Sequence, residues 1–354
     1  MSAAAPDDSL DPRAYVRRRI AENVPRLAWS DAHAANPVSR RAWQTRLRAT
    51  VRKLLGGPPT GQRPPLEPEV HETRQMDGYR REIVFFTSRP SQRVFGYFLV
   101  PNELPPGRHP AVLCLPGHGR GVDSIVGIAE DGTQRALNVP DEYQADFALQ
   151  CVARGYPTLA IEQISFGHRR DDEARRQGAN ASSCTRDSMA ALQLGETMTG
   201  WRVWDAIRAL DYLQTRPEVD RRRLAVMGIS GGGLTALFTG ALDTRVRATV
   251  VSGYLNTFAA SILSVNHCSD NYVPGLLALA EMPDIAGLVA PRALFAESGT
   301  QDDIFPLSAF EHTIARVRAL YAAFGVPDNF DHETFEGDHR FHGEGAFRFL
   351  QRRL

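Results

Sequence analysis

The sequence has no surplus of charge of either sign: its 354 residues include 41 Lys and Arg and 41 Asp and Glu. Binding to nucleic-acid phosphates requires a concentrated excess of basic side chains, so we expect no nucleic-acid partner. No apolar run approaches the ~18 residues of a membrane span, and the acidic start of the chain lacks the apolar segment of a secretion signal. We therefore expect a cytoplasmic protein without a membrane partner.

Cysteine is also scarce, with four residues that form no C-x-x-C pair: Cys114, Cys151, Cys184 and Cys268. Such wide spacing fits reduced thiols better than a disulfide scaffold. Cys114 and Cys151 fall in apolar segments and are expected in the core, whereas Cys184 and Cys268 fall in polar loops, where pairing between them stays open. The histidines lack a tight ligand spacing such as H-E-x-x-H, so we expect neither a metal nor a cofactor.

The chain is expected to divide at about residue 70. Residues 11–55 have helical periodicity, and the stretch 56–69, G-G-P-P-T-G-Q-R-P-P-L-E-P-E, is a linker in which proline prevents regular structure. This N-terminal helical extension (1–70) could pack on the following domain (71–354), cover its active site or form the contact of a homodimer.

Two strands come first, and strands and helices then alternate through most of residues 110–354. Two strands read as a hairpin around Arg89-Pro90, and the later strands are short, continuous apolar runs such as A-V-L-C-L (111–115) and L-A-V-M-G-I (224–229). Buried strands separated by amphipathic helices indicate an α/β domain with a mainly parallel central sheet and helices on both faces. The segments 167–200 and 254–283 are too long for simple connections and are expected to form lid-like walls of a pocket.

One strand ends abruptly in G-I-S-G-G-G (228–233), and a helical run follows at once. A very tight turn between strand and helix would force Ser230 into a strained backbone conformation and expose its hydroxyl above the sheet. Gly228 and Gly232, two positions away on each side, would be required because larger side chains would collide with the neighbouring elements. The pattern predicts that Ser230 is a nucleophile.

A nucleophilic serine needs a base to take its proton and an acid to orient that base, expected in this order along the chain. The acid is expected after the strand at 292–296, where Asp302 and Asp303 compete; spacing favours Asp302. The base is expected in the last loop, where His339 is favoured and His342 is assigned to the loop or to the cap of the final helix.

An acyl-transfer site also needs donors for the oxyanion. The N–H of Gly231 is expected to be one, and the N–H of His118 in L-P-G-H-G-R-G (115–121) the other. Three further residues are tentative substrate contacts, with loop packing as the alternative: Tyr254, Glu162 and His267.

With these residues, the region from about 80 to 354 resembles the α/β-hydrolase superfamily. The segments C-L-P-G-H-G-R-G (114–121), G-W-R-V-W-D-A-I-R-A-L-D-Y-L (200–213) and G-D-H-R-F-H-G-E-G-A-F (337–347) are similar to those of bacterial dienelactone-hydrolase-related and acetyl-xylan-esterase-like hydrolases. The resemblance implies an α/β-hydrolase fold and a serine hydrolase without a cofactor. Dienelactone hydrolases proper use a cysteine nucleophile where this chain has Ser230, so their reaction is not carried over.

We therefore expect a serine hydrolase that cleaves a carboxylic ester of a small or medium molecule through Ser230, His339 and Asp302. An amidase or peptidase, a thioesterase or a C–C bond hydrolase could use the same three residues. A non-catalytic binding protein of this fold would usually have lost one of them.

Overall fold

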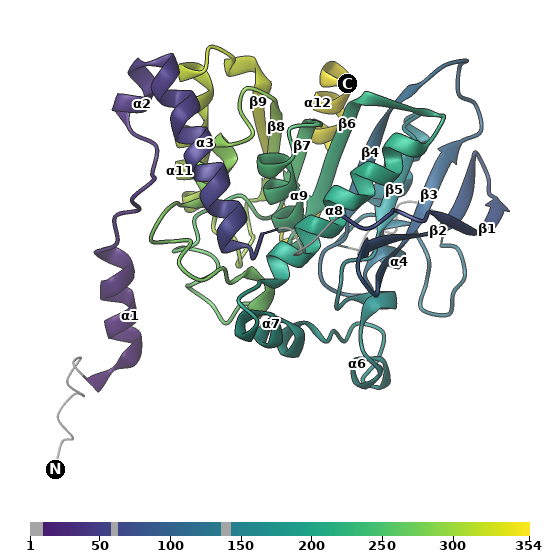
Figure 1. Cartoon of the computed structure of the whole chain (residues 1–354), viewed down its shortest axis with the longest axis horizontal. Helices are drawn as coiled ribbons and strands as arrows, with labels where there is room; N and C mark the ends of the chain where they lie inside the picture. Colours follow the sequence, from purple (N-terminus) through teal and green to yellow (C-terminus); the bar gives the residue numbers. More distant parts are fainter. Residues whose placement is uncertain (1–9, 58–62, 136–142) are drawn as a thin grey trace.

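The computed structural model describes residues 10–57, 63–135 and 143–354. Within them, nine strands form one sheet in the spatial order β1-β2-β3-β5-β4-β6-β7-β8-β9 (Figure 1). β1, β2 and β3 are antiparallel, as is β3 with β5, and the other neighbours are parallel. The expected mainly parallel sheet with an antiparallel start is confirmed. The strands are β1 Glu69–Gln75, β2 Tyr79–Arg89, β3 Gln92–Pro101, β4 His109–Leu115, β5 Thr158–Ile161, β6 Val219–Ile229, β7 Val246–Ser252, β8 Ala293–Gly299 and β9 Phe330–Phe335.

Helices cover both faces of the sheet because the side chains of its central strands alternate between two apolar layers. In β4, Leu113 and Leu115 face the layer under α8, while Val112 and Cys114 face the layer under α5 and α12. α9, α10 and α11 extend the first layer over β7 and β8. The helices are α1 Pro12–Ala21, α2 Asp31–Ala35, α3 Pro37–Leu54, α4 Val122–Ile125, α5 Phe147–Ala153, α6 Asp172–Arg176, α7 Cys184–Gln193, α8 Met198–Thr215, α9 Gly231–Leu242, α10 Met282–Gly287, α11 Leu307–Ala323 and α12 Glu344–Arg353, with short 3₁₀ turns η2 Gly167–Arg169, η3 Ser269–Asn271 and η4 Pro327–Asn329. Among the described helices, none is both long enough and apolar enough to cross a membrane.

α3 is part of the main core. Trp43, Leu47 and Val51 lie one or two helical turns apart and are buried against α9, α10 and α11. The side chain of Gln44 donates hydrogen bonds to the carbonyl oxygens of Gly287 (2.9 Å) and Ala290 (2.7 Å). This part of the N-terminal extension is therefore fixed to the C-terminal half of the sheet.

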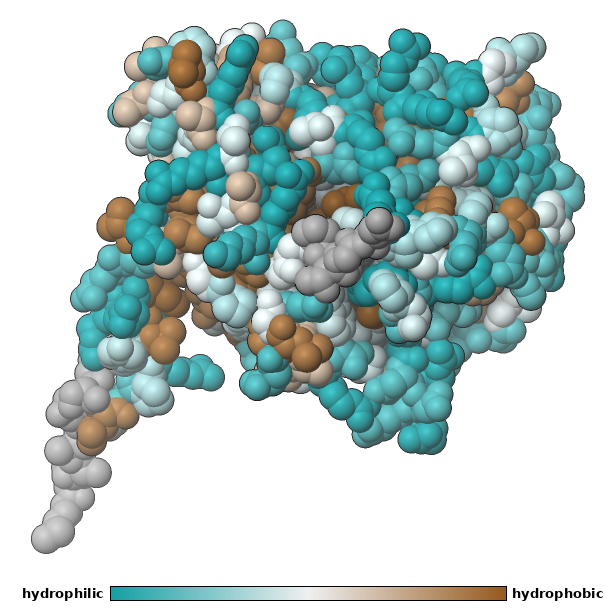
Figure 2. Space-filling model, viewed as in Figure 1, coloured by the Kyte–Doolittle hydropathy of each residue, from teal (hydrophilic) through white to brown (hydrophobic). Residues whose placement is uncertain are grey.

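α1 has the opposite environment. It stands away from the body as an arm (Figure 1), and Figure 2 shows hydrophobic side chains along it. Tyr15 and Val16 are exposed, and Ala14 is its one buried residue among those described. The chain reaches the core after this arm, where the N–H of Leu27 donates to the carbonyl of Leu279 (2.7 Å).

Several element boundaries differ from the sequence expectation, each for a local reason. β1 lies partly in the expected linker; it is an exposed, polar edge strand, so it has no apolar pattern to reveal it. The amphipathic pattern of residues 143–156 predicts a helix, but the helix begins only at Phe147, because Ala145 and Asp146 have positive φ angles of 49° and 46°. The apolar residues of 157–167 predict one buried strand, of which only β5 is formed before the chain turns into a loop.

Candidate active site

The turn between β6 and α9 places Ser230 at the carboxyl edge of the parallel strands. Its φ of 54° and ψ of −121° are outside the regions that non-glycine residues prefer. Its N–H donates to the carbonyl of Ser252 on β7 (3.0 Å), which fixes the strained turn. A Cβ atom on Gly228 would lie 2.2 Å from the carbonyl oxygen of Gly232, and one on Gly232 would lie 1.9 Å from that of Leu115. Only glycine fits at these two positions.

Asp302 lies against His339. Its Oδ2 is 2.7 Å from His339 Nδ1, and its Oδ1 accepts hydrogen bonds from the N–H groups of Ile304 (3.0 Å) and Phe305 (2.9 Å). The carboxylate is therefore fixed by its own loop and can orient the imidazole. The neighbouring Asp303 lines the pocket in front of the histidine.

The His339 ring lies between two aromatic rings, Tyr143 (centroids 6.0 Å apart) and Phe305 (5.5 Å), both tilted by 21° from it. Its Nε2 is buried and has no hydrogen-bond partner among the described residues. Ser230 and His339 line the same pocket of about 620 Å³. The three residues expected to form a triad are thus brought to one site, and the imidazole with the unpartnered nitrogen lines the same pocket as the serine.

The loop that carries His339 is held by a buried carboxylate. Glu297, at the end of β8, accepts hydrogen bonds from the N–H groups of His342 (3.0 Å) and Gly343 (2.9 Å). Burial raises the pKa of this carboxyl group. The main-chain N–H of His342 therefore helps to anchor the loop just before α12.

The two residues expected to stabilise the oxyanion face each other across the turn. Gly231 is the first residue of α9, so its N–H belongs to the unpaired N–H groups of a helix start. The 116–119 loop lies against the turn: a Cβ on Gly117 would be 3.2 Å from Ser230 Cβ, and one on Gly231 would be 3.1 Å from His118 Nδ1. The loop is held by hydrogen bonds from the N–H of Gly117 to Gln144 (2.7 Å) and from the Tyr143 hydroxyl to the carbonyl of His118. The imidazole of His118 therefore lines the pocket beside Gly231.

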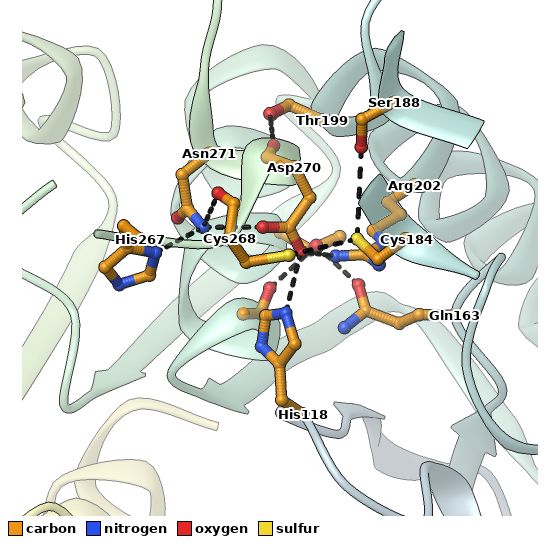
Figure 3. A network of polar contacts seen from close by, with 12 residues as sticks. His118, Gln163, Cys184, Ser188, Thr199, Arg202, His267, Cys268, Asp270 and Asn271 are labelled. Atoms are coloured by element: carbon orange, nitrogen blue, oxygen red, sulfur yellow. Dashed lines mark hydrogen bonds and ion pairs between the residues drawn. The ribbon is translucent and has the colours of Figure 1, made fainter. Parts of the chain in front are cut away.

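His118 has a carboxylate of its own. Its Nε2 is 3.3 Å from Asp270 Oδ2, and Asp270 also forms an ion pair with the fully buried guanidinium of Arg202 (Figure 3). Burial by itself would lower the pKa of His118, but the charge of Asp270 outweighs it and raises the pKa to about 9. Burial likewise would raise the pKa of Asp270, and the charges of His118 and Arg202 instead hold it well below its usual value. At neutral pH the site therefore contains an imidazolium.

The three tentative substrate contacts have different surroundings. His267 lines the pocket, and its Nδ1 is 2.9 Å from the amide nitrogen of Asn271. Tyr254 is buried and packs against Phe305 (centroids 5.3 Å apart).

Glu162 has no exposed surface and accepts hydrogen bonds from the N–H groups of Val122 (3.1 Å) and His168 (3.1 Å). Positions 121 and 167 must be glycine to leave room for its carboxylate, since a Cβ at either would come within 2.1 Å of it. This is the environment of a loop anchor.

Among the residues that the structure describes, two groups of side chains have donor atoms close enough to surround a cation. One consists of His118, Cys184, Cys268 and Asp270 beside the pocket, and the other of the surface residues Glu333, His342 and Glu344. In the first group, the guanidinium of Arg202 already lies against Asp270 and 3.4 Å from Cys184 Sγ.

A separate cavity of about 500 Å³ lies between α3, α8 and the start of β7. Its lining includes Arg52, Arg63, Trp204 and Arg245 but no serine or cysteine among the described residues.

Sequence reasoning missed the Arg202–Asp270 pair. A signal for Arg202 was present, because it lies on the buried side of α8 with Val203, Ala206 and Ala209, where a charge has to be paired. Nothing in the sequence pairs it with Asp270, 68 residues further on.

Comparison with known proteins shows the family of this chain. The model described as "Abhydrolase family" matches residues 6–342. "Putative hydrolase YtaP" of Bacillus subtilis is 28% identical over 279 residues, which cover 78% of this chain and 87% of that protein. "4-O-methyl-glucuronoyl methylesterase 1" of Wolfiporia cocos is 31% identical over 158 residues, 37% of this chain and 38% of that protein. A crystal structure described as a "putative acetyl xylan esterase" from Bacteroides fragilis superposes with a TM-score of 0.80 at 22% identity, covering 99% of this chain and 97% of that one.

Proposed function

Since the chain belongs to the Abhydrolase family, we propose that it is a serine hydrolase that cleaves a carboxylic ester of a small or medium molecule through Ser230, His339 and Asp302. The relatives with a named activity are carboxylic-ester hydrolases, which agrees with the enzyme class expected from the sequence. The observation that carries the proposal is that Ser230 lines one pocket together with the His339 ring, which Asp302 holds at 2.7 Å and whose Nε2 has no hydrogen-bond partner among the described residues. The dienelactone-hydrolase part of the resemblance stays a prediction.

In the proposed reaction, His339 Nε2 removes the proton of the Ser230 hydroxyl while the oxygen attacks the ester carbon. Asp302 keeps the ring in place and stabilises its positive charge. The negative charge that develops on the carbonyl oxygen is stabilised by the N–H groups of Gly231 and His118. His339 then protonates the leaving alcohol, and a water molecule releases the acyl group by the same steps in reverse.

We propose an ester of a carbohydrate as the substrate class. The relatives act, by their names, on acetyl xylan and on glucuronoyl methyl esters. The pocket of about 620 Å³ lies in the ordinary range for small-molecule sites, and its polar lining of His118, His267 and Asp303 suits a hydroxylated partner.

The test is hydrolysis of p-nitrophenyl esters from acetate to long acyl chains by the wild-type protein and by Ser230→Ala purified in parallel. Turnover of short esters by the wild type alone supports the triad. Hydrolysis of acetylated xylose is then compared with hydrolysis of a methyl glucuronate, which tells which of the two classes of carbohydrate ester the protein prefers. A folded wild-type protein that hydrolyses none of these esters would overturn the proposal, and amide, thioester and C–C substrates would be tested next.

A further inference from the structure

The two insertions around the pocket each contribute one cysteine to a close pair. Cys184 is the first residue of α7, and Cys268 lies just before η3. Their sulfur atoms are 3.3 Å apart, with the Cys268 thiol donating to Cys184 (Figure 3). A disulfide bond requires about 2.05 Å, so a shift of little more than 1 Å would join them.

The surroundings of Cys184 favour its thiolate form. Nη2 of Arg202 is 3.4 Å from its sulfur, and this guanidinium is fully buried, so its charge is poorly screened. These surroundings lower the pKa of Cys184 to about 6. The hydrogen bond from Cys268 is the largest cause, burial acts in the opposite direction, and the charge of Arg202 lowers the pKa further. The same contact raises the pKa of Cys268. One member is therefore a thiolate at neutral pH while the other keeps its proton.

The pair is also accessible from the pocket. Cys184 itself is buried, but Cys268 is partly exposed and lines the pocket together with Ser230 and His267. The pocket therefore gives a small oxidant a route to Cys268, and the sulfur of Cys184 lies 3.3 Å behind it.

The other two cysteines form a natural control. Cys114 on β4 and Cys151 on α5 have sulfur atoms 3.8 Å apart. Both are completely buried in an apolar layer, and burial raises the pKa of Cys114. Proximity is thus similar in the two pairs, but only the pair on the pocket wall has a neighbouring guanidinium and a route to solvent.

The positive charge of Arg202 makes this group of four side chains a poor site for a metal ion. A cation bound by Cys184, Cys268, His118 and Asp270 would face a buried guanidinium that already contacts two of the four ligands. Two positive charges in that space would repel each other with little screening.

We propose that Cys184 and Cys268 are a redox-modification site, where a hydroperoxide converts the dithiol into a disulfide that ties the 167–200 insertion to the 254–283 insertion on the wall of the catalytic pocket. The Cys184 thiolate attacks the terminal oxygen of the hydroperoxide and breaks its O–O bond, which gives a sulfenic acid. The leaving group is an alkoxide, or hydroxide when the oxidant is hydrogen peroxide, and it takes up a proton from water. The Cys268 sulfur then attacks the sulfenic sulfur, its proton leaves with the departing hydroxyl as water, and the S–S bond forms. A dithiol reductant reverses the reaction, and none of these steps uses Ser230.

The experiment treats the full-length wild-type protein with hydrogen peroxide under native conditions, then counts free thiols after denaturation and maps the linked peptides by mass spectrometry. We expect the count to fall from four to two, with a mass loss of about 2 Da, a peptide pair joining Cys184 to Cys268, and full recovery with dithiothreitol. The Cys268→Ser variant cannot form this disulfide. Its Cys184 should instead stop at the sulfenic acid, which dimedone traps. Cys151→Ser, which removes the buried pair, should still lose two of its three thiols.

Three results would overturn the proposal. The first is a wild-type protein, folded by circular dichroism, that keeps four thiols. The second is a linkage that maps to Cys114 and Cys151. The third is zinc purified with the protein at one ion per chain, released when the pocket thiols are alkylated, because the cluster would then be a metal site.

Discussion

Two histidine–aspartate pairs border the same pocket, and their surroundings differ. Asp302 accepts hydrogen bonds from main-chain N–H groups and lies 2.7 Å from His339, whose Nε2 has no hydrogen-bond partner among the described residues. Asp270 is backed by Arg202, and His118 beside it is held as a cation by a pKa raised to about 9. In the proposed mechanism the same two residue types thus provide a base in one place, while in the other place the histidine carries a positive charge. The environment of the carboxylate, more than the pair itself, determines the role of the histidine.

The largest effect is expected when the free imidazole is removed. His339→Gln should lower kcat for a short p-nitrophenyl ester by about 10⁴- to 10⁶-fold, because the serine loses its base. His342→Gln is the matched control three residues away, and it should stay within about threefold of wild type because its main-chain N–H to Glu297 remains. The reverse ranking of the two variants would show that the base has been misassigned.

The acid of the first pair comes next. Asp302→Asn should lower kcat by about 10⁴-fold, since an amide no longer holds the imidazole in the productive tautomer. Asp303→Asn changes the adjacent residue, which lines the pocket, and should lower kcat by less than about tenfold. Equal losses in steady-state kinetics of the two folded variants would remove the distinction between these two acids.

The second pair is tested by pH. Because the pKa of His118 is raised to about 9, its positive charge is present below that pH and is lost above it. His118→Gln keeps the main-chain N–H and removes the charge, so kcat/KM at pH 7.5 should fall by about 10- to 100-fold. The wild-type profile should decline as pH rises through about 9, and the variant should lack this decline. The same decline of kcat/KM above pH 9 in both proteins would mean that the positive charge of His118 does not contribute to catalysis.

The smallest effect on activity is expected for Glu162, whose carboxyl group is held by main-chain N–H groups. Its pKa is instead expected to affect the stability of the fold. Burial raises the pKa of Glu162 to about 7, so the folded chain holds a proton there that the unfolded chain loses near pH 4.5. This contribution to stability is present below pH 4.5 and is lost as pH rises through about 7.

Glu162→Gln should therefore remove part of the decline in urea-unfolding free energy between pH 5 and pH 8, by at most about 3 kcal/mol. The comparison uses the slope of each protein against pH, so a constant loss of stability in the variant does not affect it. Parallel slopes would show that Glu162 is already ionised in the folded protein at pH 5.

The parts of the fold that could be predicted are those that local constraints define. Ser230 stood out because the strained turn needs Gly228 and Gly232 at fixed spacing, and the apolar strands stood out because each is buried on both faces. β1 could not be predicted, since an edge strand with a polar sequence has no pattern of burial.

The second pair could not be predicted for a different reason. Arg202 and Asp270 belong to separate segments, and only tertiary packing brings them to His118. Glu162 shows the same limit. Its position at the end of β5 allowed either a substrate contact or a role in holding a loop, and in the folded chain two glycine-containing loops close around it.

The attachment of α3 also has a consequence for biosynthesis. Gln44 bonds to the carbonyl of Gly287, 243 residues further along the chain. At ribosomal rates of about 5 to 20 residues per second, α3 would be made on the order of 10 to 50 seconds before its partners. During that interval Trp43, Leu47 and Val51 lack the α9–α11 surface that buries them. We therefore expect the apolar face of the nascent helix to be open to chaperones that recognise apolar segments, well before the pocket exists.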